Sequence, residues 1–249
     1  MAATARFYVK AHGPDDDAVR RGLIWLGQEA QKAGRGTLHV PGLANLQSLS
    51  HILRNVDAIA KSKVFRLKGA PIGIATLRTG EVRGAVLALW TDDKILEGIE
   101  DRWRPPAICA IPWNGSDIDG WVAAFGPVEI RTGAAADAVV VSNPVVIEAL
   151  RSLTSSVNLG TGLSHPSDRD AAVGAFRALR NAGERFDPAE VRAWAAAHGW
   201  NQRHATELAE IAQKVLDGRR IRTHSPHWKA DIVGYWRDRA SRPPGERAP

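Results

Sequence analysis

The spacing of apolar side chains changes along this chain from short strand-like runs to a helical period. From residue 5 to about residue 131, brief apolar runs alternate with amphipathic segments, and from about residue 142 apolar residues recur every three or four positions. The first pattern predicts strands alternating with helices, and the second predicts helices alone. We therefore expect domains at residues 1–135 and 142–240 and a disordered tail at 241–249.

Two continuous apolar runs dominate the first domain. The runs at 85–90 (AVLALW) and 107–113 (AICAIPW) are typical of strands that are covered on both faces. We also expect strands at 5–11, 37–40, 64–67, 72–77 and 128–131, with helices at 15–33, 43–60, 94–101 and 116–125. This alternation predicts an α/β fold, a three-layer, Rossmann-like domain with a mostly parallel sheet.

The second domain is expected to be all-α. Capping residues and glycines divide it into helices at 144–152, 168–181, 189–198, 201–216 and 227–239. Ser167 and Asp187 are the expected N-caps of two of these helices, and Pro188 suits a first helical position.

The segment 187–223 resembles a helix-turn-helix in general layout, with two helices joined at Gly199 and a basic end. Side chains near the start of its second helix could hydrogen-bond base edges or phosphates, and the arginines beyond it could hold phosphates. The predicted nucleic-acid-binding residues are Asn201, Gln202, Arg203, Thr206, Arg219, Arg220 and Arg222. The same pattern also fits an ordinary helical hairpin with solvated charges.

The net charge of +6 is concentrated in the second domain. Residues 1–150 hold 17 Lys and Arg against 16 Asp and Glu, whereas residues 151–249 hold 16 against 11. A basic, arginine-rich domain favours contact with phosphates. However, 25 of the 33 basic residues in the whole chain are arginine, and high genomic GC content would produce the same bias.

A second candidate site lies where the predicted strands end, because ligands of open parallel sheets bind at the carboxyl edge. Its residues would be His12, Trp90, Asp92, Trp113, Asn114 and Asp117. A nucleotide-like ligand could stack on either tryptophan. Neither glycine-rich phosphate loop is present, however, and the acids are also explained as helix caps.

Other chemistry has little support in the sequence. His224 and His227 form an H-x-x-H pair without a second close cluster, so we expect no metal site, and we expect no cofactor. Cys109 lies in the middle of a predicted strand, and no G-x-S-x-G motif occurs. There is no apolar run of transmembrane length and no leader-like segment, so we expect a cytoplasmic protein without membrane contact.

These observations leave three functional hypotheses. The leading one is a nucleic-acid-binding or regulatory protein whose helical domain contacts the phosphate backbone of DNA or RNA. One alternative is an enzyme or sensor that binds a nucleotide-like molecule at the strand ends. The other is a protein-interaction adaptor that uses some of the nine tryptophans as anchors. The sequence does not decide whether the protein is an enzyme.

Overall fold

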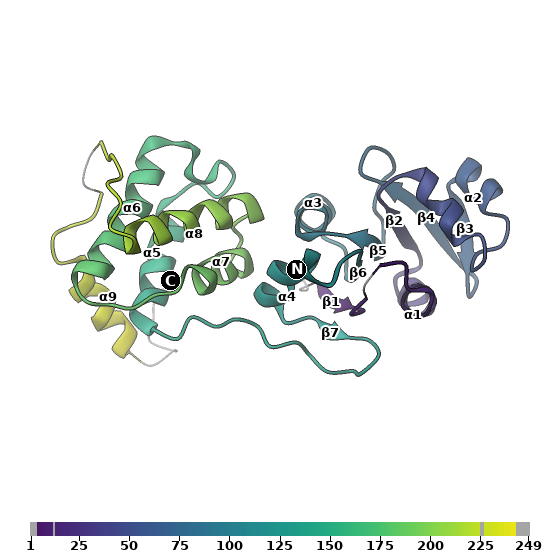
Figure 1. Ribbon diagram of the computed structural model, residues 1–249, viewed down its shortest axis with the longest axis horizontal. Helices are drawn as coiled ribbons and strands as arrows, with labels where there is room; N and C mark the ends of the chain where they lie inside the picture. The colour runs from purple at the N-terminus through teal and green to yellow at the C-terminus, as the bar shows by residue number, and fades with distance from the viewer. Residues whose placement is uncertain (1–3, 12, 225–226, 243–249) are drawn as a thin grey trace. The chain divides into compact units, whose positions relative to one another are not determined.

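The computed structural model describes residues 4–11, 13–224 and 227–242, and it divides the chain into two units (Figure 1). Residues 1–137 form an α/β unit, and residues 138–249 form a helical unit. All strands of the described residues lie in the α/β unit.

The α/β unit is built on one seven-stranded sheet in the order β3-β4-β2-β5-β6-β1-β7. Only the pairing of β3 with β4 is antiparallel. This order differs from the 3-2-1-4-5-6 order of the Rossmann fold. The strands are β1 (Ala5–Tyr8), β2 (Gly36–Val40), β3 (Val64–Leu67), β4 (Ala70–Thr76), β5 (Ala85–Thr91), β6 (Ala107–Pro112) and β7 (Val128–Glu129).

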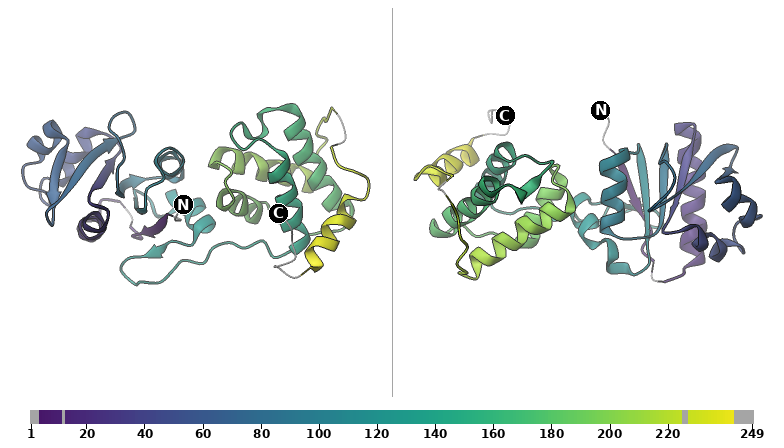
Figure 2. Two further views of the ribbon diagram at one scale, coloured as in Figure 1. Left: turned by 180° about the vertical axis from the view of Figure 1, so that it is seen from behind. Right: turned by 90° about the horizontal axis from the view of Figure 1, so that it is seen from above.

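Helices cover both faces of the sheet (Figures 1 and 2). On one face α1 (Asp16–Ala33), η1 (Leu43–Leu49) and α2 (Val56–Ser62) share a core with the strands. On the other face α3 (Asp93–Trp103), η2 (Gly115–Ile118) and α4 (Asp119–Phe125) close a second core. The sequence therefore correctly predicted an α/β layer structure with a mostly parallel sheet.

The connections that leave β2 and β5 diverge. The chain leaves β2 toward β4 through η1 and α2 on the α1 face, and it leaves β5 toward β6 through α3 on the opposite face. Because the two connections run in opposite directions on opposite faces, the carboxyl ends of β2 and β5 form a topological switch point, where sheets of this kind bind ligands.

The helical unit contains α5 (Pro144–Ser156), η3 (Gly162–Ser164), α6 (Pro166–Asn181), α7 (Pro188–Ala197), α8 (Gln202–Leu216) and α9 (Ile232–Ser241). Asp187 caps α7 through the backbone N–H of Ala189, and Pro188 takes the first helical position, as expected. Gly199 has a φ of +88°, a left-handed conformation that allows the tight turn between α7 and α8.

Three sequence predictions about elements are wrong. The expected helix at 43–60 is two helices, because Asn55 adopts a left-handed conformation (φ +58°) that no continuous α-helix allows. His165, rather than Ser167, caps α6. The last helix begins at Ile232 instead of residue 227, and it extends to Ser241 into the expected tail, whose residues 243–249 lie outside the described residues. Within the described ranges, no helix is long and apolar enough to span a bilayer.

Candidate functional site

The structure brings together two of the residues predicted at the strand ends. The rings of Trp90 and Trp113 meet edge to face with centroids 6.3 Å apart, and Trp113 is 46% exposed. Trp90 is held at φ +53°, at the irregularity between β5 and β6, and its indole Nε1 is buried without a hydrogen-bond partner among the described residues. His12 lies outside the described residues.

The other predicted strand-end residues serve as local caps. The Asp92 carboxylate accepts a hydrogen bond from the backbone N–H of Ile95 (2.8 Å) and so caps α3. Asn114 and Asp117 form a reciprocal capping box, in which the Asn114 N–H donates to Asp117 at 2.7 Å. Their position in the sequence is thus explained by helix initiation, although Asp92 also lines the groove described next.

A groove of about 570 Å³ opens beside the carboxyl ends of β2, β4 and β5. One wall is α3, the other is the segment 76–82 that leads from β4 to β5, and the floor contains His39 and Ala75. We call it the α3 groove. One end of it lies at the switch point of the sheet, and it has the volume of a small-molecule site.

His39 is the unusual residue of the α3 groove. It lies near the end of the interior strand β2 and is only 4% exposed. Its Nδ1 is buried, and no described residue hydrogen-bonds the ring. A buried polar atom without a partner destabilises a fold by about 1–3 kcal/mol, and a hydrogen bond to the ring would offset that cost.

Burial also determines the charge of this imidazole. Desolvation lowers the pKa of His39 to about 4, because the charged ring would lose its water without gaining a partner. His39 is therefore neutral at pH 7. A neutral imidazole in the floor of a groove can donate or accept one hydrogen bond to a ligand without attracting it by charge.

The rim of the α3 groove supplies positive charge. Arg78, Lys94 and Arg102 are exposed lining residues, and Asp92 is the acidic residue among those lining it. The guanidinium of Arg102 lies 4.8 Å from the ring of Trp103, which also lines the groove. Apolar walls beneath a cationic rim suit an organic anion.

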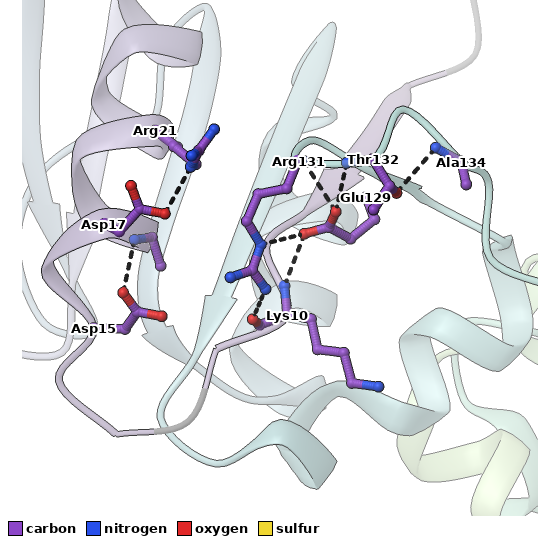
Figure 3. A network of polar contacts seen from close by, with 9 residues as sticks. Lys10, Asp15, Asp17, Arg21, Glu129, Arg131, Thr132 and Ala134 are labelled. Atoms are coloured by element: carbon purple, nitrogen blue, oxygen red, sulfur yellow. Dashed lines mark hydrogen bonds and ion pairs between the residues drawn. The ribbon is translucent and has the colours of Figure 1, made fainter.

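A separate polar network ties the segment that follows β1 to the edge strand β7 (Figure 3). The buried Glu129 carboxylate accepts hydrogen bonds from the backbone N–H groups of Lys10 and Thr132 and from Arg131. Burial by itself would raise the pKa of Glu129, but these hydrogen bonds outweigh it and lower the pKa. With its oxygens engaged by the protein, Glu129 is a structural residue.

In the helical unit, two of the predicted nucleic-acid-binding residues have structural roles. Asn201 caps α8 by accepting a hydrogen bond from the N–H of His204 at 2.9 Å. Gln202 is buried and accepts a hydrogen bond from Arg192. Arg203 is exposed, and Thr206 is half-buried. The start of α8 therefore presents fewer polar groups to solvent than the sequence suggested.

The predicted arginine cluster remains at the surface. Arg219, Arg220 and Arg222 are all exposed, and Arg219 lies 3.4 Å from the Asp217 carboxylate. Between them Ile221 is buried, and its carbonyl accepts a hydrogen bond from Arg177 of α6 at 2.5 Å. The buried side chain and this hydrogen bond fix the segment to the helical core, so Arg220 and Arg222 point outward.

Other candidate chemistry is not assembled in the described part of the chain. No group of three or more His, Cys, Asp or Glu side chains there could hold a metal ion. His224 donates its backbone N–H to the buried Asp170. Cys109 is fully buried in β6, and its burial raises the pKa of the thiol.

The sequence reasoning missed His39 and the cations around it. One signal was available, since His39 interrupts the apolar part of the strand GTLHV, and a histidine inside a buried strand is uncommon. Nothing local indicates that Arg78, Lys94 and Arg102 lie beside it, because strand order brings them together.

One protein-family model matches part of the chain. Residues 142–237, within the helical unit, match the model of a family described as a domain of unknown function, DUF1889. The chain is also similar to a protein from Salmonella typhimurium whose crystal structure is known. The two sequences are 24% identical over an alignment that covers 38% of this chain and 94% of the other, with a TM-score of 0.34. No curated protein matches the chain.

Proposed function

We propose that the α/β unit binds a small organic anion in the α3 groove, as a sensor or as the substrate-binding part of an enzyme. The observation that carries this proposal is His39, a buried imidazole without a partner that lines the groove. A ligand that hydrogen-bonds the imidazole would offset part of the cost of burying it.

The charge of the groove supports an anion, in particular one that carries phosphate. Arg78, Lys94 and Arg102 come from both walls, and a phosphate beside any of them would be held by charge-assisted hydrogen bonds. The nucleotide-like ligand expected at the strand ends belongs to this class, with the site displaced from the tryptophan pair to the β2–β5 switch point of a Rossmann-like sheet.

Isothermal titration of the full chain with inorganic phosphate, ribose 5-phosphate and nucleoside 5′-monophosphates tests this proposal. We expect at least one organic phosphate to bind, and the double variant Lys94→Ala/Arg102→Ala to weaken its binding about tenfold or more. The matched control is Arg54→Ala/Lys61→Ala, which removes the same charge from exposed positions that do not line the groove. Absence of heat with every probe would reject the proposal.

Nucleic-acid binding by the helical unit is the second candidate, and one observation favours it. The segment that carries Arg220 and Arg222 is fixed by the buried Ile221 and by Arg177, so the two guanidinium groups are held on an ordered backbone. Alternate residues of an extended chain lie roughly 6–7 Å apart and point to the same side, which suits contacts to successive phosphates.

Fluorescence anisotropy with labelled duplex DNA and RNA between 50 and 200 mM salt tests this second candidate. We expect binding that weakens with salt, and Arg220→Ala/Arg222→Ala should reduce the slope of log K against log salt by about 2. Arg185→Ala, at another exposed position of the helical unit, is the control. If no binding occurs at 50 mM salt, nucleic acid is not the partner.

A further inference from the structure

A glycine in the middle of α3 has no role in packing. Gly98 lies between Asp93 and Trp103 and is exposed, and a Cβ atom built there would meet nothing within 4 Å. Glycine inside a helix destabilises it relative to alanine, so the free protein would gain from a side chain at this position. Packing within the protein therefore does not explain the glycine, and contact with a bound molecule would.

Gly98 lies in the wall of the α3 groove between two of its cations. Lys94 and Arg102 are four residues before and after it, so all three share one face of the helix, with a rise of about 6 Å between neighbours. At Gly98 the groove wall is bare helix backbone, flanked on each side by a positive charge.

The groove around this bare surface combines apolar side chains with a buried polar group, His39. Leu77 of the opposite wall is 60% exposed, and Ile99 and Trp103 of α3 add further apolar surface. His39 lies in the floor with an imidazole that no described residue hydrogen-bonds. The histidine is an observation independent of the glycine, and it too favours ligand binding in this groove.

We propose that the ligand of the α3 groove carries a flat heteroaromatic ring that lies against the backbone at Gly98, as in a nucleoside monophosphate. The ring faces Leu77, its polar edge reaches His39, and its phosphate meets Lys94 or Arg102. This inference rests on the proposed function, since it specifies the ligand of the same groove. A phosphate alone would need only the cations, whereas a flat ring explains both the glycine and the histidine.

Calorimetry with the four nucleoside 5′-monophosphates, ribose 5-phosphate and inorganic phosphate tests whether a heteroaromatic ring contributes to binding. We expect at least one mononucleotide to bind about tenfold or more tightly than ribose 5-phosphate, because the ring contributes stacking and apolar contact. Gly98→Leu, which places a side chain where the ring lies, should remove this difference. His39→Leu should reduce it as well.

The melting temperature of each variant shows whether weaker nucleotide binding is caused by misfolding. Gly98→Ala should raise the melting temperature by roughly 2–4 °C while weakening nucleotide binding. The matched control is Gly27→Ala, in the middle of α1, where a Cβ would make ordinary contacts from 3.4 Å with Leu67 and Lys68. This control should leave nucleotide binding unchanged.

The possible outcomes separate the two proposals. Equal affinity for ribose 5-phosphate and all mononucleotides would contradict the proposed contact between a ring and Gly98, and so would a Gly98→Leu variant that still prefers nucleotides. Either result leaves the proposed anion site intact. Absence of binding by every probe overturns both. A melting temperature lowered by Gly98→Ala overturns the argument from the glycine, because it would show that the free protein needs glycine there.

Discussion

In the helical unit the buried carboxylate of Glu148 lies between two arginines, whereas in the α/β unit the buried imidazole of His39 has no hydrogen-bond partner among the described residues. Glu148 is fully buried, with Arg151 at 2.5 Å and Arg239 at 3.0 Å. His39 is almost as deeply buried, yet its Nδ1 makes no contact that offsets the loss of water.

The two residues illustrate different uses of a buried polar group. Glu148 joins α5 to α9, and Asp170 of α6 likewise holds the segment at His224, so both carboxylates fix the C-terminal segment to the helical core. His39 joins nothing and lies in the floor of a groove. A buried charge with partners indicates a structural role, and a buried neutral polar group without a partner beside a groove favours a ligand.

A buried unpartnered atom is not sufficient by itself. His204 of the helical unit also has a buried Nδ1 without a partner in the described ranges. Its ring packs against Gly162, where a Cβ would come within 2.1 Å of it. His204 does not line the α3 groove. Location in a groove, rather than the unpaired atom alone, distinguishes His39.

The largest expected effect tests the structural side of this comparison. Glu148→Ala should lower the free energy of unfolding by about 3 kcal/mol, because it leaves two arginines without their buried counter-charge. Urea unfolding of the full chain measures it. Glu210→Ala, which removes an exposed pair with Lys214, should cost about 0.5 kcal/mol or less. Equal losses in the two variants would show that burial of Glu148 does not matter.

The next effect is the pH dependence that His39 produces. An unfolded histidine takes up a proton near pH 6.5, whereas folded His39 does so only near pH 4, so the folded state loses stability as the pH falls from 6.5 to 4. The full loss is about 3 kcal/mol, from the two pKa values. Urea unfolding at several pH values should show it in the native protein and not in His39→Leu, and parallel pH profiles would contradict the assignment.

A smaller effect is expected from His39→Leu at pH 7. Replacing an unsatisfied polar ring by an apolar side chain should stabilise the α/β unit by about 1–2 kcal/mol. The same variant should bind the ligand of the α3 groove less tightly. Loss of stability would instead mean that the imidazole has a structural role, as Glu148 does.

The smallest expected effect concerns Asp92, which both caps α3 and lines the groove. Asp92→Asn keeps a good N-cap, so the free energy of unfolding should change by less than about 0.5 kcal/mol. Removing a negative charge from a site for anions should raise affinity by about threefold at low salt. Asp187→Asn, at the cap of α7, should change neither quantity. Unchanged affinity in Asp92→Asn would place the anion away from α3.

The sequence by itself determined the local elements of this protein and the division between an α/β part and a helical part. Caps such as Asp15, Asp92 and Asp187 act within a few residues, and the apolar period within an element depends only on the local backbone. Local reasoning failed at Asn55, where a left-handed residue divides an expected helix. It also predicted that Asn201 and Gln202 bind nucleic acid, whereas both side chains make hydrogen bonds within the helical unit.

Only the tertiary structure decided where a ligand could bind. The α3 groove exists because β2 lies between β4 and β5, so that His39 meets residues from about 40 to 60 positions further along the chain. Strand order is set by non-local pairing and by the packing of helices on both faces, which no local pattern encodes. The chemistry of His39, a neutral and unsatisfied imidazole, follows from that burial and could not be seen in the strand GTLHV alone.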